Sequence, residues 1–117
     1  MYLGDIDTSL ITDMSYLFYE DILKNKIIRI DFSGIENWDV SNVINMRNMF
    51  CKCYTFNQPL NNWDVSNVTN MNTMFFGCYT LNQDFSNWSL NKLTNINEMF
   101  KDSFLEKKAE YMPKKSN

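Results

Sequence analysis

Apolar positions recur along the chain with a fixed period. The three tryptophans are spaced 25 residues apart, and a phenylalanine follows each of them by twelve residues; these six are Trp38, Trp63, Trp88, Phe50, Phe75 and Phe100. Residues 37–61 and 62–86 are identical at 16 of 25 positions. Self-similarity at a period of this length is typical of arrays in which each repeat forms one structural unit.

Within the copy at 62–86, the pattern predicts two elements. Apolar residues at every third position from Val65 to Phe75 favour a helix or a tight 3-10 coil. Asp64 or Ser66 is placed to cap its start, and Gly77 to close its end. The segment 79–88 is short, rich in aromatics and polar at alternate sites, which favours a brief strand and turns. In the preceding copy such a strand begins at or after Pro59, because proline lacks an N–H group.

A unit this small cannot bury its own apolar face, whereas neighbouring units can cover one another. We therefore predict a repeat solenoid, an α/β stack of about four turns with atypical capping ends. Residues 1–36 form a degenerate first repeat, which aligns Ile6, Met14 and Phe18 with later copies at a spacing of 32, plus an insertion. Residues 37–104 form three repeats, at 37–61, 62–86 and, in part, 87–104.

The two ends of the chain allow alternatives. The insertion at 24–32 is predicted to supply an edge strand, with a basic recognition patch as the alternative. Residues 105–117 form a polar tail, which we expect to be a solvated disordered end. The alternative is that its lysines dock on an acidic partner.

Recurring columns define the expected core and surface. The predicted structural core consists of Trp38, Trp63, Trp88, Met49, Met74, Met99, Phe50, Phe75 and Phe100. Two asparagine columns (Asn37, Asn62 and Asn87; Asn45, Asn70 and Asn95) are predicted to bridge the backbones of successive turns, with a ligand-contacting surface as the alternative. Variable polar positions form the candidate partner-binding surface: Arg47, Asn48, Asn72, Thr73, Asn97 and Glu98.

The net charge and the hydropathy of the chain argue against two kinds of partner, nucleic acid and the membrane interior. The net charge of −3, without a basic cluster, argues against nucleic acid. No apolar stretch reaches the roughly 18–20 residues that span a bilayer, so no membrane insertion is expected. The first residues lack the basic and apolar regions of a signal peptide.

Candidate chemistry is sparse. Three cysteines and no histidine exclude a Cys/His zinc site. Cys53 and Cys78 share a column and are predicted to be a buried pair, with a disulfide or redox role as the alternative. Asp39 and Asp64, one repeat apart, could form a carboxylate dyad or bind calcium, but we interpret them as helix caps. No phosphate loop or nucleophile triad is present, so we expect no enzyme activity, no cofactor and no metal.

The repeated phrase is specific enough to suggest a family. The pattern W-D-V-S-N-V-T-N-M-x-x-M-F, with F/L-N-Q after it, resembles the BspA-type leucine-rich repeat of surface proteins. The resemblance implies a leucine-rich-repeat-like solenoid and a non-enzymatic adhesion or protein-binding module, with a protein or glycan partner. The alternative is a structural or assembly component, such as a minor particle protein of a large DNA virus. The residues do not define a cellular location; the resemblance implies a cell surface, with a virion or the cytoplasm as the alternative.

Overall fold

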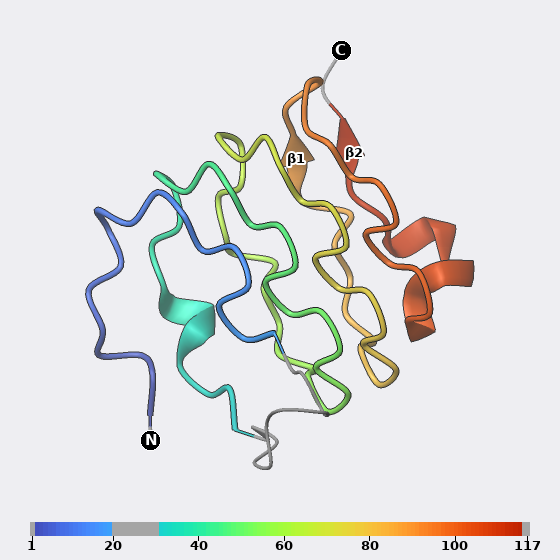
Figure 1. The fold of residues 1–117 in the computed structure, drawn as a ribbon, viewed down its shortest axis with the longest axis horizontal. Coiled ribbons are helices and arrows are strands. Elements are labelled where there is room, and N and C mark those ends of the chain that lie inside the picture. The colour runs from blue at the N-terminus through green and yellow to red at the C-terminus, as the bar shows by residue number, and fades with distance from the viewer. Residues whose placement is uncertain (1, 20–30, 116–117) are drawn as a thin grey trace.

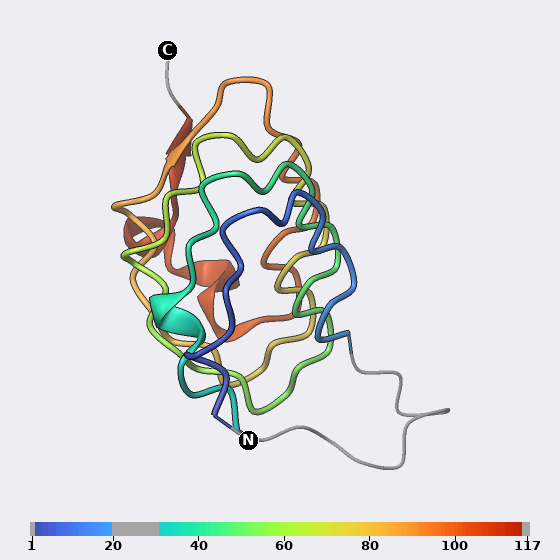
Figure 2. The ribbon, with the colours of Figure 1, turned by 90° about the vertical axis from the view of Figure 1, so that its left-hand side faces the viewer.

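The computed structural model describes residues 2–19 and 31–115 of the chain. Its repeats lie side by side as coils that follow one another along the molecule (Figure 1). We name them coil 1 (residues 2–19), coil 2 (37–61), coil 3 (62–86) and coil 4 (87–102). Seen along the row, the coils superimpose around a shared interior (Figure 2). Most of the predicted 24–32 edge strand lies outside the described residues.

Hydrogen bonds between main chains hold neighbouring coils in register. We call residues 12–19, 44–52, 69–77 and 94–102 the ladder side. There, single parallel bridges join Asp13 to Asn45, Asn45 to Asn70 and Asn70 to Asn95. The ladder continues beyond each bridge: the N–H of Met46 donates to the oxygen of Asn70 at 2.8 Å, and the N–H of Phe50 to that of Met74 at 2.9 Å. Residues of equal position in the repeat therefore lie next to each other.

The helix or tight 3-10 coil predicted from Val65 to Phe75 is not continuous; the structure has separate turns there, with hydrogen bonds between residues three apart. The N–H of Val68 donates to the oxygen of Val65 at 3.1 Å, and the N–H of Met74 donates to that of Met71 at 3.2 Å. The N–H groups of Met71 and Phe75 instead donate to oxygens of coil 4. The hydrogen bonds between coils thus use main-chain N–H groups that a helix would need for its own bonds. The apolar period of three therefore comes from successive turns.

Regular elements are short in the described parts of the chain. They are the 3-10 helices η1 (Ile35–Asn37), η2 (Phe104–Lys107) and η3 (Ala109–Tyr111), and the strands β1 (Ser89–Leu90) and β2 (Lys114–Lys115). The predicted strand at 79–88 is therefore wrong, because β1 begins after it. The copy with Pro59 contains no strand among its residues.

Each coil turns its corners through left-handed backbone. Tyr16, Asn48, Thr73 and Glu98 occupy the same position in successive coils and have φ of 61, 55, 52 and 53°. A second corner is left-handed at Lys52, Gly77 and Asp102, with φ of 62, 73 and 59°. Gly77 thus has the conformation expected of a helix-closing glycine, but it closes a turn. The corner path is shared by coils that differ in the corner residue.

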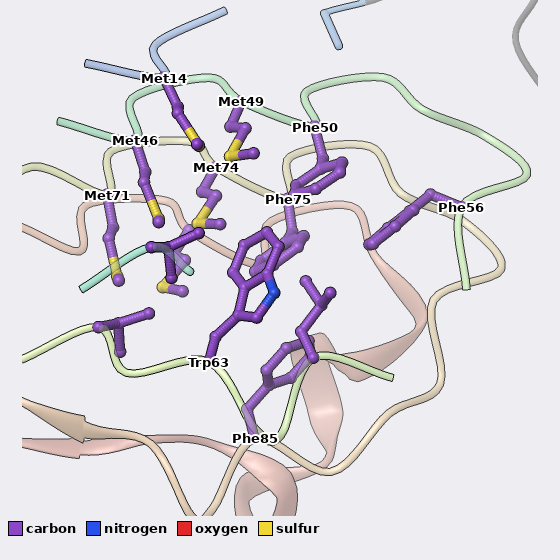
Figure 3. Packing of buried hydrophobic residues seen from close by; sticks show 14 of the residues in the cluster. Met14, Met46, Met49, Phe50, Phe56, Trp63, Met71, Met74, Phe75 and Phe85 are labelled. Carbon is purple, nitrogen blue, oxygen red and sulfur yellow. The ribbon is translucent and has the colours of Figure 1, made fainter. Parts of the chain in front are cut away.

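Side chains of equal position form buried columns between the coils (Figure 3). Rings of Phe18, Phe50, Phe75 and Phe100 stack in order, with centroids 5.3, 5.5 and 5.4 Å apart. The residues predicted as structural core are 0–8% exposed; they are Trp38, Trp63, Trp88, Met49, Met74, Met99, Phe50, Phe75 and Phe100. Stacking in register buries each apolar face against the next coil.

Each tryptophan side chain also donates a hydrogen bond to the main chain of the preceding turn. The indole N–H groups of Trp38, Trp63 and Trp88 donate to the main-chain oxygens of Leu3, Ile35 and Leu60 at 2.8, 2.9 and 2.8 Å. A buried indole N–H usually requires such a partner. The repeated tryptophan therefore combines apolar packing with one directional bond per coil.

The described C-terminal part of the chain packs against the last repeat. Strand β2 pairs in parallel with β1, and Leu105 is fully buried. Residues 103–115, which we call the C-terminal segment, lie against coil 4 at the end of the row (Figure 1). The predicted disordered tail is therefore wrong over 105–115. The segment is mostly polar, but its buried Leu105 belongs to the apolar core and holds the segment against the last repeat.

Candidate functional site

The candidate partner-binding residues gather along the first corner of the ladder side. Arg47, Asn97 and Glu98 are exposed, whereas Asn48, Asn72 and Thr73 are half-buried. The Thr73 hydroxyl is 2.5 Å from Asn48 Oδ1 and 2.6 Å from the Asn72 oxygen. The Asn72 side-chain oxygen accepts the Asn97 N–H at 3.1 Å. The half-buried members thus help to hold the corners, and the three exposed ones remain available to a partner.

A shallow groove lies beside this corner and was not predicted from the sequence. It encloses about 520 Å³ and is lined by Leu10, Thr12, Asn42, Ile44, Asn67 and Thr69. Leu10 is 87% exposed and Ile44 is 50% exposed. A signal was present in the sequence, because Ile44 replaces the threonine found at the equivalent positions 12 and 69. An apolar Ile44 between the exposed Thr12 and Thr69 marks a surface that can bury part of a partner.

The polar walls of the groove are held in place by the adjacent coils. The side-chain amide of Asn42 donates to the Ser9 oxygen, and that of Asn67 to the Ser41 oxygen, both at 2.7 Å. Asn42 and Asn67 therefore bridge successive coils, which is the role predicted for the two other asparagine columns. The Asn42 and Asn67 side chains of the groove are therefore held in place before any partner binds.

The predicted bridging by the Asn45, Asn70 and Asn95 side chains is wrong. Their oxygens accept the N–H two residues ahead, at 2.9–3.0 Å, and the main chain alone bridges the coils at these positions. In the other predicted column (Asn37, Asn62 and Asn87), the side-chain amide of Asn37 donates to the Tyr2 hydroxyl at 3.3 Å. Local turns satisfy an asparagine oxygen at little entropic cost, and here they prevail over contacts between coils.

The side chains of Asp39 and Asp64 accept hydrogen bonds within turns and do not form an acid–base pair. Asp39 Oδ1 accepts the Ser41 N–H and hydroxyl at 3.0 and 2.6 Å, and Asp64 accepts those of Ser66 at 3.1 and 2.6 Å. The hydroxyl bond, followed by the backbone bond, lowers the pKa of both carboxyls. A dyad that shares a proton needs one raised pKa, so this geometry does not support one. The predicted capping role is corrected to closure of a turn.

The cysteines are buried as thiols. Cys51, Cys53 and Cys78 are not in disulfides, and Cys78 Sγ lies 3.0 Å from the Phe50 oxygen. Burial raises the pKa of the Cys78 thiol well above its usual range and also raises that of Cys51. Low thiolate content and lack of access make such thiols inert toward oxidants and electrophiles. The geometry favours a packing role over the redox alternative.

Within residues 2–19 and 31–115, no three His, Cys, Asp or Glu side chains come close enough together to hold a metal ion. The same part of the chain contains no helix with the length and apolarity needed to cross a membrane.

The in-register coils define a protein of internal repeats. The family model that matches the chain is described as "Mycoplasma protein of unknown function, DUF285" and covers residues 2–110. The chain belongs to this family. No curated protein and no solved structure matches it.

Proposed function

We propose that the chain is a non-enzymatic protein-binding module of the adhesion type, built as a short solenoid of BspA-like leucine-rich repeats. The observation that carries this proposal is the groove over coils 1–3, where Leu10 and Ile44 expose apolar surface between fixed amides and hydroxyls. The resemblance of the repeat phrase to the BspA type supports the same function.

Rigidity supports binding at this position. The ladder and the buried columns fix the groove walls, so a partner orders few side chains of this protein when it binds. An extended protein segment could place an apolar side chain against Ile44 and meet Thr12 or Thr69 with its backbone. Arg47 and Asn97 at the neighbouring corner would contribute the polar rim that surrounds the apolar centre of many interfaces.

The test selects binding peptides from a random library displayed on phage, with the full chain as bait, and measures their affinity for two variants. Ile44→Lys removes the apolar centre of the groove, and Tyr79→Lys alters a similarly exposed residue outside it. Burying the exposed half of an isoleucine is worth about 1 kcal/mol, so we expect Ile44→Lys to weaken binding at least about fivefold. Tyr79→Lys should leave the affinity unchanged.

Arg47→Ala and Asn97→Ala probe the corner in the same assay. We expect smaller losses of affinity there, because exposed polar contacts contribute little. If selected peptides bind the parent, Ile44→Lys and the corner variants equally well, neither surface is a binding site and the proposal fails.

A further inference from the structure

We propose that copies of this chain associate head to tail, with coil 4 of one copy docking on coil 1 of the next. The reason is that the ladder ends in complementary rows at the two ends of the molecule. The interaction differs from the groove proposed above and does not depend on it.

Coil 4 presents a row of free donors. On the ladder side, alternate N–H groups of each coil donate to oxygens of the following coil, as those of Met71, Thr73 and Phe75 do at 2.8, 3.0 and 2.9 Å. The equivalent groups of coil 4 belong to Ile96, Glu98 and Phe100. Among the described residues nothing accepts from them, and we call these three N–H groups the donor edge.

Coil 1 presents the matching acceptors. The oxygens of Asn45, Arg47 and Met49 in coil 2 accept from the N–H groups of coil 1. Their equivalents in coil 1 are the oxygens of Asp13, Ser15 and Leu17, which accept no hydrogen bond within the described parts of the chain. We call these oxygens the acceptor edge.

The two edges fit each other and do not fit themselves. Both use every second residue, so a coil 1 placed after coil 4 would continue the parallel ladder in the same register. Two donor edges cannot pair, which excludes a symmetric dimer through this surface. A contact between different surfaces of identical copies is heterologous and repeats without closing unless the geometry forms a ring.

Apolar columns also end in exposed side chains at both ends. Val43 and Val68 are fully buried; in coil 1 their column ends in Ile11, which is 37% exposed, and in coil 4 it ends in the buried Thr94. Ile96 continues the column of Met46 and Met71 and is 37% exposed. Docking coil 4 on coil 1 would cover Ile96 of one copy and Ile11 of the next.

Charge favours the same pairing. The described part of coil 1 contains Asp5, Asp7 and Asp13 and no lysine or arginine. Coil 4 carries Lys92 and Lys101 against Glu98 and Asp102, and the C-terminal segment adds four lysines against Glu106 and Glu110, so this end has a net charge of +2. Opposite charges at the two ends attract unlike ends and repel two copies of coil 1.

The C-terminal segment limits the contact area. β2 covers coil 4 on the side away from the ladder and adds a layer of about 4.8 Å there. The ladder sides can therefore meet only if the two copies tilt, and the contact stays well below the roughly 1,600 Å² of a standard interface. We expect weak, concentration-dependent association.

Disulfide trapping tests the register directly on the full chain. In a continued ladder, position 97 of one copy lies beside position 15 of the next, as position 72 lies beside 97. We would mix Ser15→Cys with Asn97→Cys under mild oxidation; the native cysteines are buried and do not compete. We expect the mixed disulfide to exceed either homodimer several-fold, and Ser15→Cys mixed with Asn82→Cys to give only background.

A charge variant tests the energetic basis. Ile11→Lys, introduced into the Ser15→Cys chain, removes an apolar side chain from the acidic end and adds a charge that coil 4 and the C-terminal segment repel, so it should reduce the mixed disulfide about tenfold. Asn82→Lys adds the same charge away from both edges and should leave it unchanged. Circular dichroism confirms that each variant is folded. Equal amounts of mixed and homodimeric disulfide, or undiminished trapping with Ile11→Lys, would overturn the proposal.

Discussion

Phe75→Ala tests whether the coils depend on one another for stability. The Phe75 ring is fully buried and lies between the stacked rings of Phe50 and Phe100 at 5.5 and 5.4 Å. It therefore supports the interfaces on both sides of coil 3. Phe100 is 8% exposed and stacks on this column from one side only. In a row of units coupled to nearest neighbours, the interior ring should matter more than the terminal one.

The magnitude follows from burial and ring contacts. Truncating a buried phenylalanine to alanine costs about 3–5 kcal/mol, and each lost ring pair adds about 0.5–1.5 kcal/mol. With two stacked partners lost, we expect Phe75→Ala to cost about 4–8 kcal/mol and Phe100→Ala at least about 1 kcal/mol less. A chain of 117 residues has a total stability of roughly 6–17 kcal/mol. Phe75→Ala should thus remove about a quarter of the total stability or more.

Urea unfolding followed by tryptophan fluorescence and circular dichroism measures both variants. Trp38, Trp63 and Trp88 lie in successive coils, so fluorescence reports on the whole row. A loss for Phe75→Ala below about 2 kcal/mol, or equal losses for the two variants, would refute the argument that each coil is supported from both sides.

Three further predictions concern single positions. Thr73 has left-handed backbone with φ 52°, a conformation that costs roughly 1–2 kcal/mol and that asparagine tolerates better. Thr73→Asn should therefore raise the free energy of unfolding by about 0.5–1 kcal/mol, measured in urea. A lower free energy of unfolding would show that the hydrogen bonds of the Thr73 hydroxyl contribute more than the relief of backbone strain. The Ser66 bonds lower the pKa of Asp64, so its stabilisation is present above the unfolded value near 3.8 and is lost as the pH falls through the lower folded value. Asp64→Asn should therefore reduce the loss of stability between pH 5 and 2, and an unchanged pH profile would contradict this. Cys78 should react with a thiol reagent only in denaturant, because burial raises its pKa and blocks access; rapid labelling of the native chain would contradict its position.

The sequence revealed the period and the buried columns because both follow from residue type alone. It did not reveal that the period of three belongs to turns, since a helix and a run of turns bury the same positions and differ in where the N–H groups donate. The groove was missed because it depends on which exposed columns become neighbours. In coil 4, Leu93 is exposed and Thr94 is buried, opposite to the pattern of Val68 and Thr69. Thr94 donates to the Val68 oxygen at 2.7 Å, a contact that residue type alone does not predict.

The shared left-handed corner has a consequence for how such a chain can change over time. Tyrosine, asparagine, threonine and glutamate all occupy it with φ between 52 and 61°, so the neighbouring main chains dictate the bend whatever the side chain. Substitutions there can alter size, charge or hydrogen-bonding capacity at a cost of only a kcal/mol or two. Lineages could thus diversify the outward chemistry of each corner independently while inheriting an unaltered framework.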